Sequence, residues 1–195
     1  MLEIVFASQN EHKIKEVNEI TTPFKVLALA PDEGFNPVEN ANTFEENSLI
    51  KVLEAVRVEK SGRKLFLADD SGLEIEALNN EPGIYSARYA ETSEARIQKV
   101  LDNLKGVENR NARFVCAMTL TDEKGEVLYK TKGICKGKIA HEPKGENGFG
   151  YDPIFIPDGY NQTMAEIPEK TKNLISHRGR ALVEVIIWMK LSKKL

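Results

Sequence analysis

The pattern of apolar and polar positions predicts strands and helices that alternate through the first half of the chain. Continuous apolar runs indicate buried strands, and apolar residues three and four positions apart indicate helices with one buried face. These patterns place strands at 2–7, 25–29 and 65–68. One helix is expected directly after the turn at 8–10 and another at 43–60, with a loop rich in Pro, Gly and Asn at 31–42. The helix at 43–60 is the most clearly marked, because Thr43 and Glu46 have capping-box spacing and Gly62 follows its end.

Strands are gathered in the middle of the chain. Residues 112–121 alternate between apolar and polar side chains, and a turn at 122–125 separates them from one long or two short strands at 127–140. This arrangement predicts an antiparallel hairpin. The other expected elements are strands at 73–78 and 154–156, helices at 92–104 and 176–191, and a glycine-rich loop at 145–150. Alternating elements followed by consecutive strands predict an α/β fold with a mixed sheet.

Composition and charge narrow the class of protein. The chain has 195 residues, of which 41% are hydrophobic and 29% charged, a balance typical of one globular domain. The net charge of −3 and the lack of an Arg/Lys stripe argue against nucleic acid as a partner. Without a signal peptide or a bilayer-spanning apolar run, the sequence predicts a soluble cytoplasmic protein and no membrane contact. Cys116 and Cys135 lack metal-ligand spacing and are expected to be buried free thiols.

The segment Ser8–Lys13 is the first of four candidate functional groups. It lies at a strand-to-helix turn, where backbone N–H groups and the helix dipole favour phosphate, and Lys13 adds a cation. The alternative is structural, with Ser8 or Asn10 serving only as an N-cap.

The second group is the acidic pair Asp69 and Asp70, which directly follows a buried strand. Ligand sites of α/β proteins gather at the carboxyl ends of strands, and adjacent carboxylates are costly unless a cation joins them. Gly72 is expected to let the chain turn sharply here. The alternative is a polar turn with an aspartate as its cap.

The third and fourth groups lie in the last third of the chain. In the loop 145–152, glycines around Phe149 allow close approach to a flat ligand, on which the ring could stack; the alternative is a hairpin loop with an aromatic plug. Lys172 precedes His177 and Arg178, which fall in the first turn of the last helix. Cations oppose the dipole there, so a bound anion or a base oxygen would explain them, unless the helix start is merely solvated.

Together these segments resemble the inosine triphosphate pyrophosphatase family, whose members hydrolyse dITP, ITP and XTP. The motifs that carry the resemblance occur in order from near the N-terminus to Leu182, and they are Ser8–Lys13, Glu39–Asn47, Asp69–Leu73, Pro82–Ala90, Gly148–Phe155 and Ser176–Leu182. The one departure is Gln9, where the family usually has glycine. The family fold is an elongated mixed β-sheet flanked by helices, with two lobes around a deep central cleft, and the resemblance implies a homodimer.

The resemblance also implies a reaction and its residues. Noncanonical purine nucleoside triphosphates would be hydrolysed to the monophosphate and pyrophosphate with Mg²⁺, which keeps them out of DNA and RNA. Asp70 is the implied catalytic base and, with Glu39, the implied metal ligand; Glu46 competes with Glu39 but has a structural role in the capping box. The implied substrate-binding residues are Ser8, Gln9, Asn10, Glu11, His12, Lys13, Ser71, Phe149, Gly150, Tyr151, Asp152, Lys172, His177 and Arg178.

Discrimination of the base requires donors to the 6-oxygen of hypoxanthine or xanthine, since a donor facing the amino group of adenine stays unpaired. His177 and Arg178 are the candidate donors, and Lys13 and Lys172 are the candidate phosphate clamps. Two alternatives remain open. One is a pyrophosphatase acting on modified pyrimidine nucleotides, and the other is a non-hydrolytic nucleotide-binding protein, against which Asp70 and Glu39 argue.

Overall fold

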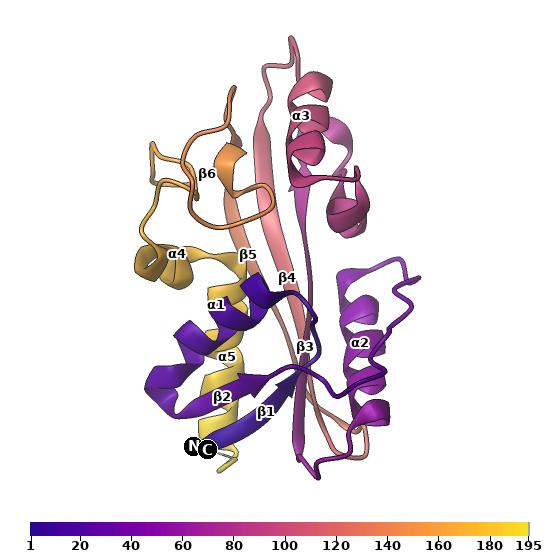
Figure 1. The fold of residues 1–195 in the computed structure, drawn as a ribbon. Helices are drawn as coiled ribbons and strands as arrows, with labels where there is room; N and C mark the ends of the chain where they lie inside the picture. Colours follow the sequence, from indigo (N-terminus) through magenta and orange to yellow (C-terminus); the bar gives the residue numbers. More distant parts are fainter. Residues whose placement is uncertain (195) are drawn as a thin grey trace. The chain divides into compact units, whose positions relative to one another are not determined.

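The computed structural model describes residues 1–194 and confirms an α/β fold with helices flanking a mixed sheet (Figure 1). The strands are β1 (Leu2–Phe6), β2 (Val26–Leu29), β3 (Leu65–Ile75), β4 (Asn111–Asp122), β5 (Val127–Ile139) and β6 (Phe155–Pro157). The helices are α1 (Glu11–Thr21), α2 (Phe44–Val58), α3 (Ser93–Asn103), α4 (Glu169–Ile175) and α5 (His177–Leu191). The six strands follow the order β2-β1-β3-β4-β5-β6, with β1 parallel to both of its neighbours and β6 antiparallel to β5.

Strands β4 and β5 form the expected antiparallel hairpin. At its turn the amide of Asp122 donates to the carbonyl of Glu126 at 3.1 Å, and at its other end the amide of Ile139 donates to the carbonyl of Arg110 at 2.9 Å. Gly125 has a φ of +80° in the turn, a conformation that favours glycine. Strand β5 is one continuous element, so the alternative of two short strands is excluded.

The chain divides into two compact units, and both take residues from β3, β4 and β5. Unit 1 contains Met1–Asp70, Cys116–Gly133 and the segment from Arg178 onward, whereas unit 2 contains Ser71–Val115 and Ile134–His177. Each unit has its own hydrophobic core and is described by itself. The deep cleft that the family resemblance implies stays a prediction.

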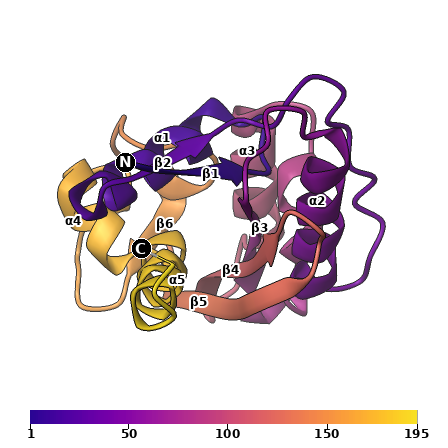
Figure 2. The ribbon, with the colours of Figure 1, turned by 90° about the horizontal axis from the view of Figure 1, so that it is seen from below.

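Unit 1 is layered, with helices on both faces of its strands. Ile4 and Phe6 of β1 lie in a cluster with residues of α1 and α5, whereas Val5 and Ala7 lie in a cluster with residues of α2. Figures 1 and 2 show α1 and α5 on one side of these strands and α2 on the other. Because both faces are covered, β1 ends in the buried apolar run Ile4-Val5-Phe6, as a buried parallel strand requires.

Unit 2 packs helix α3 against the remaining parts of the strands. Leu73 and Ile75 of β3 share a buried cluster with Val100 of α3, Phe114 of β4 and Phe155 of β6. The rings of Phe114 and Phe155 are 4.6 Å apart between centroids. This core supports the loop that follows β5 and carries the glycine-rich motif.

The expected turn at Asp69–Gly72 is wrong, because β3 runs without interruption from Leu65 to Ile75. The prediction ended the buried strand at Ala68 and placed both acids after it. Asp69 is 0% exposed and Asp70 is 6% exposed, and both are paired with cations that offset their burial. The strand expected at 73–78 likewise ends at Ile75 and continues as a 3-10 turn.

Three further expectations can be compared with the described residues. Cys116 and Cys135 are buried thiols outside any disulfide, as expected. Helix α4 was not expected from the sequence. No helix within residues 1–194 combines the length and apolarity needed to cross a membrane.

Thr43 caps the start of α2 as expected, and its hydroxyl contacts the Glu46 carboxylate. The amide of Glu46 donates to Thr43 Oγ1 at 3.2 Å, and Thr43 Oγ1 donates to Glu46 Oε2 at 2.9 Å. We expect Thr43→Ala to lower the free energy of unfolding by about 1 kcal/mol, measured by urea denaturation. Thr43→Ser keeps the hydroxyl and serves as the control; equal stability of the Ala and Ser variants would show that the cap contributes nothing.

Candidate functional site

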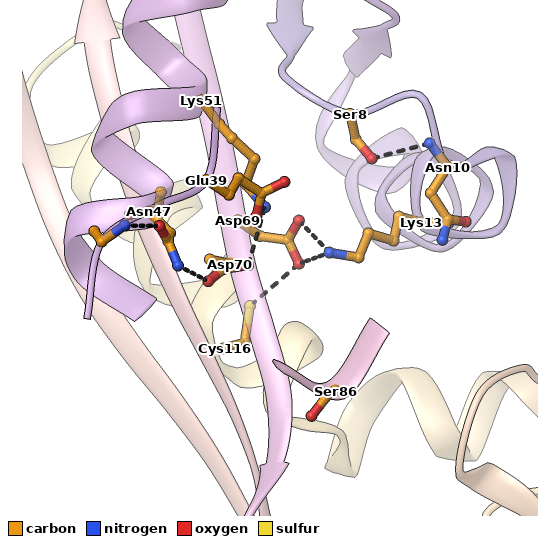
Figure 3. A network of polar contacts seen from close by, with 12 residues as sticks. Ser8, Asn10, Lys13, Glu39, Asn47, Lys51, Asp69, Asp70, Ser86 and Cys116 are labelled. Carbon is orange, nitrogen blue, oxygen red and sulfur yellow. Dashed lines mark hydrogen bonds and ion pairs between the residues drawn. The ribbon is translucent and has the colours of Figure 1, made fainter. Parts of the chain in front are cut away.

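Asp69 of β3 is the most completely enclosed charge of unit 1. Lys13 Nζ donates to its Oδ1 at 2.9 Å and to its Oδ2 at 3.1 Å. Arg178 donates to the same Oδ2 from Nε at 3.2 Å and from Nη2 at 3.0 Å. The thiol of Cys116 is 3.8 Å from Oδ2 (Figure 3). Asp69 therefore joins α1, β3 and the start of α5.

The charges around Asp69 fix its ionisation. Burial opposes the charged form, but Lys13 and Arg178 outweigh it and hold the pKa of the Asp69 carboxyl far below its ordinary value. Burial in turn lowers the pKa of Lys13 and raises that of the Cys116 thiol. Asp69 is thus a permanent anion, and the thiol beside it stays protonated.

Arg178 is held by a second carboxylate. Its Nη1 donates to Glu16 Oε2 at 2.6 Å, and the side chain is 2% exposed. Although burial opposes it, the carboxylates of Asp69 and Glu16 raise the pKa of Arg178. The cation in the first turn of α5 is therefore balanced by carboxylates of the protein itself, and a bound anion is not needed to explain it.

Asp70 faces a different set of partners. Lys51 Nζ donates to Asp70 Oδ1 at 3.0 Å and to Glu39 Oε2 at 3.1 Å. Asn47 Nδ2 donates to Asp70 Oδ2 at 3.1 Å, and Asn47 Oδ1 accepts the amide of Ala41 at 3.1 Å (Figure 3). Asn47 therefore fixes both the Asp70 carboxylate and the loop that carries Glu39.

The two neighbouring carboxyls differ in basicity. Burial raises the pKa of Asp70, and the attraction of Lys51 only partly opposes this effect. Burial opposes the charge of Lys51 as well, but Asp70, Asp69 and Glu39 outweigh it and raise the pKa of this lysine. Asp70 is consequently the more basic of the pair, a property that suits a general base.

Glu39 and Asp70 suit a divalent cation. Both carboxylates turn towards one positive charge, the ammonium of Lys51. The network of Glu16, Glu39, Asp69, Asp70, Lys13, Lys51 and Arg178 holds four carboxylates and three cations, so one negative charge is left over within it. Residues 1–194 contain no cluster of three or more His, Cys, Asp or Glu side chains arranged for a metal. Two carboxylates completed by water and phosphate are what Mg²⁺ commonly uses.

Glu46, which competes with Glu39 as the metal ligand, accepts a hydrogen bond from Thr43 at the start of α2, which agrees with a structural role.

The segment Ser8–Lys13 is held by hydrogen bonds at the start of α1. Ser8 Oγ accepts the amide of Asn10 at 3.1 Å, and Asn10 Oδ1 caps α1 by accepting the amide of Lys13 at 3.2 Å. Gln9 Nε2, at the position where the family usually has glycine, donates to the carbonyl of Phe35 at 3.1 Å. Glu11 and His12 are exposed at the start of α1, and Ser71 is half-buried on β3.

A second set of predicted residues lies together in unit 2. Asp152 Oδ2 accepts from the amide of Phe149 at 2.9 Å and from Lys172 Nζ at 2.7 Å. Lys172 Nζ also lies 5.2 Å from the centroid of the Phe149 ring. Gly148 has a φ of +75°, and a Cβ there would be 2.1 Å from Asp152 Oδ2. Only glycine therefore lets the loop close on this carboxylate.

Of the remaining predicted residues of unit 2, Tyr151 and His177 are buried and Gly150 is half-buried. The His177 ring stacks on Phe114 with centroids 4.7 Å apart and an interplanar angle of 12°. The hydroxyl of Tyr151 donates to the carbonyl of Ser86 at 2.8 Å. Gly150 follows Phe149 with a φ of +62°.

Sequence reasoning missed four residues of the unit 1 network, namely Glu16, Asn47, Lys51 and Cys116. Asn47 and Lys51 carried a usable signal, because they occupy buried positions of α2 alongside Phe44 and Val52. A polar residue on the apolar stripe of a helix needs a buried partner. Glu16 carries a weaker signal of the same kind next to Val17.

The pairing of Asp69 has a consequence for stability. Its pKa is lower in the folded than in the unfolded chain, so its contribution is complete above about pH 3.9 and is lost as the pH falls below that value. We expect Asp69→Asn to destabilise the fold by about 3–5 kcal/mol at pH 7. The difference should shrink by about 1.4 kcal/mol per unit below about pH 3.9, because Asn does not titrate.

Urea denaturation of both proteins between pH 7 and pH 3 measures this effect. Asp102→Asn is the matched control, since Asp102 pairs with Lys105 on the surface and should matter far less. A destabilisation by Asp69→Asn that does not depend on pH would contradict the ionic role.

The chain is similar to named proteins over nearly its whole length. A model described as the Ham1 family matches residues 4–188. A dITP/XTP pyrophosphatase of Methylacidiphilum infernorum (isolate V4) is 43% identical over 191 residues, which cover 95% of this chain and 93% of the relative. The dITP/XTP pyrophosphatase of Bacillus subtilis (strain 168) is 46% identical over 191 residues, which cover 93% of this chain and 94% of the relative.

Solved structures match the fold as well. A HAM1 protein from Coxiella burnetii has a TM-score of 0.84 and 41% identity, covering 97% of this chain and 99% of that chain. The Staphylococcus aureus Ham1 protein has a TM-score of 0.81 and 39% identity, covering 99% and 100%. The resemblance drawn from the motifs is confirmed, since sequence and fold agree along nearly the whole chain. The chain belongs to the Ham1 family.

Proposed function

We propose that this protein hydrolyses noncanonical purine nucleoside triphosphates, namely dITP, ITP and XTP, to the monophosphate and pyrophosphate. The observation that carries the proposal is the setting of Asp70, a buried carboxyl of raised pKa held by Asn47 and Lys51 beside Glu39. Relatives named dITP/XTP pyrophosphatase support the substrate class. Removal of these nucleotides would keep them out of DNA and RNA.

A divalent metal is part of the proposal, with Mg²⁺ as the ion and with Glu39 and Asp70 as the residues that hold it. When bound, Mg²⁺ neutralises phosphate charge and orients the oxygens for in-line displacement. The carboxylates of both residues already lie within 3.1 Å of a single cationic nitrogen.

Asp70 acts as the general base. It orients a water molecule and accepts its proton as the water oxygen attacks the α-phosphorus and pyrophosphate leaves. Asn47 keeps the carboxylate in position through Oδ2, and Lys51 supplies positive charge on the side of Oδ1. A base of raised pKa accepts the proton more readily than an ordinary aspartate would.

The phosphates bind to the first motif. The turn at Ser8–Asn10 presents the amino end of α1, whose dipole favours anions, and Lys13 follows on its first turn. Asp69 keeps the ammonium of Lys13 in place at 2.9 Å. In unit 2, Lys172 is the second phosphate clamp and is held by Asp152 in the same way.

The base binds to the groups of unit 2. Phe149 stacks on the purine ring, and the buried His177 is the proposed donor to the 6-oxygen. Arg178 contributes to the site indirectly, through its contacts with Asp69 and Glu16. Arg178→Ala is therefore a poor test of base recognition, because it removes a partner of Asp69.

The two alternatives predict different chemistry. A pyrophosphatase for modified pyrimidine nucleotides would need no donor to a 6-oxygen, and a nucleotide-binding protein without hydrolysis would need no base. The basic Asp70 favours hydrolysis over mere binding. The proposal also includes a homodimer, which light scattering tests, and a cytoplasmic location, which cell fractionation tests.

The first prediction concerns substrates. With Mg²⁺ present, pyrophosphate release from dITP, ITP and XTP should exceed release from ATP by at least about ten-fold in kcat/KM, as expected for one base-edge hydrogen bond to the 6-oxygen that adenine lacks. GTP shares this oxygen, so its rejection requires a clash with its 2-amino group, and GTP, CTP and UTP are assayed in the same panel. A coupled pyrophosphate assay on parallel reactions measures the ratios. Highest activity on a modified pyrimidine triphosphate would support the alternative enzyme.

The second prediction concerns the metal and the base. Asp70→Asn is nearly isosteric and should lower kcat by about 10²-fold or more, because the proton acceptor and one metal ligand are lost. Glu39→Gln should raise the Mg²⁺ concentration needed for half-maximal activity, and EDTA should abolish activity.

Glu46→Gln is the matched control for the metal, since glutamine keeps the capping box. Its Mg²⁺ requirement should equal that of the unsubstituted protein. If Glu46→Gln rather than Glu39→Gln shifts the requirement, the metal assignment moves to Glu46.

A further inference from the structure

The motif Pro82–Ala90 has no role in the function described so far. Part of it forms the 3-10 turn Gly83–Arg88 in unit 2, and Ser86 is its buried residue, at 7% exposure. A short polar side chain in such a place is normally held by hydrogen bonds; the Ser86 hydroxyl makes two of them, and the Ser86 carbonyl accepts a third.

The bonds of Ser86 connect three segments of unit 2. Its Oγ accepts the amide of Leu73 of β3 at 2.9 Å and donates to the carbonyl of Gly83 at 2.6 Å. Its own carbonyl accepts the hydroxyl of Tyr151 at 2.8 Å. The sheet, the turn and the loop after β5 therefore meet at one residue.

Tyr151 is the residue of the loop after β5 that bonds to Ser86. It is 5% exposed, and its ring lies in the core cluster of unit 2. Burial raises the pKa of the phenol, so the hydroxyl keeps its proton and donates it to Ser86. An apolar ring would fill the same space but could not make this bond.

Two hydrogen bonds therefore hold the chain at and after Phe149. The amide of Phe149 itself donates to Asp152 Oδ2 at 2.9 Å. Two residues along the chain, Tyr151 is tied to Ser86. Between them lies Gly150, whose φ of +62° is a conformation that favours glycine. The bond from Tyr151 to Ser86 restrains the chain directly after Gly150.

We infer that the hydrogen bond from Tyr151 to the Ser86 carbonyl positions Phe149 for stacking on the purine base. This makes Tyr151 and Ser86 positioning residues and gives the motif Pro82–Ala90 a role in substrate binding. The inference rests on the proposed stacking role of Phe149. Because stacking depends on the orientation of the ring, loss of the restraint weakens base binding and leaves the chemistry at Asp70 intact.

Tyr151→Phe tests the inference, because it removes one hydroxyl and keeps the ring. We expect the KM for ITP to rise about five-fold, the effect of one ordinary hydrogen bond, while kcat at saturating ITP and its dependence on pH stay unchanged. A general structural defect would instead lower kcat and the fraction of active enzyme.

Tyr89→Phe is the matched control. Tyr89 belongs to the same motif, and its hydroxyl bonds to Glu81 at 3.3 Å and Asn103 at 3.1 Å, neither of which belongs to the loop 145–152. It should leave both KM and kcat unchanged. A KM for Tyr151→Phe equal to that of Tyr89→Phe, or a fall in kcat in place of the KM effect, overturns the inference.

Phe149→Ala separates this inference from the function on which it rests. A large rise in KM for Phe149→Ala without one for Tyr151→Phe rejects the positioning role and keeps the stacking role. An unchanged KM for Phe149→Ala rejects the stacking role and the inference with it, while the substrate panel still reports on the activity itself.

Discussion

The buried carboxylate of Asp69 is the constraint on which unit 1 depends. An unpaired anion at 0% exposure would cost several kcal/mol, so the strand that carries it must meet two cations. Lys13 comes from α1 and Arg178 from α5. Both helices lie on one side of the strands, where their apolar side chains join the same buried cluster (Figures 1 and 2). Hydrophobic packing and charge compensation therefore require the same arrangement of helices.

The alternation of a β-strand gives the next residue a different role. Successive side chains point to opposite faces, so Asp69 meets α1 and α5, and Asp70 meets Asn47 and Lys51 of α2. One carboxyl is locked in its charged form, and its neighbour keeps a raised pKa. A turn at this position, as first expected, would not separate the two acids in this way.

Local signals in the sequence predicted most of the fold. The capping box of α2, the apolar run of β1 and the alternation of β4 each depend on neighbours within a few residues. The continuity of β3 could not be predicted in this way, because the partners of Asp69 lie 56 residues before it and 109 residues after it. Without them, two adjacent aspartates indicate a turn.

The sequence likewise predicted some residues of the candidate site and missed others. Motifs identified Glu39, Asp70 and Lys172, but the resemblance assigned their roles, and no local pattern showed that Lys51 would join two of the acids. Arg178 was correctly marked as a cation in an unfavourable place, yet its anions belong to the protein. An unfavourable residue identifies a compensating partner, and the sequence alone does not reveal whether that partner is a ligand or another side chain.

Under the proposed function, the charges of the network suit a divalent metal together with a polyphosphate. Its four carboxylates and three cations leave a net charge of −1, which attracts a divalent cation and repels a free triphosphate. With a divalent ion added, the same residues would carry +1, and the sign would favour a polyphosphate. Glu39 supplies the difference, because without its charge the network would hold three carboxylates and three cations and would be neutral.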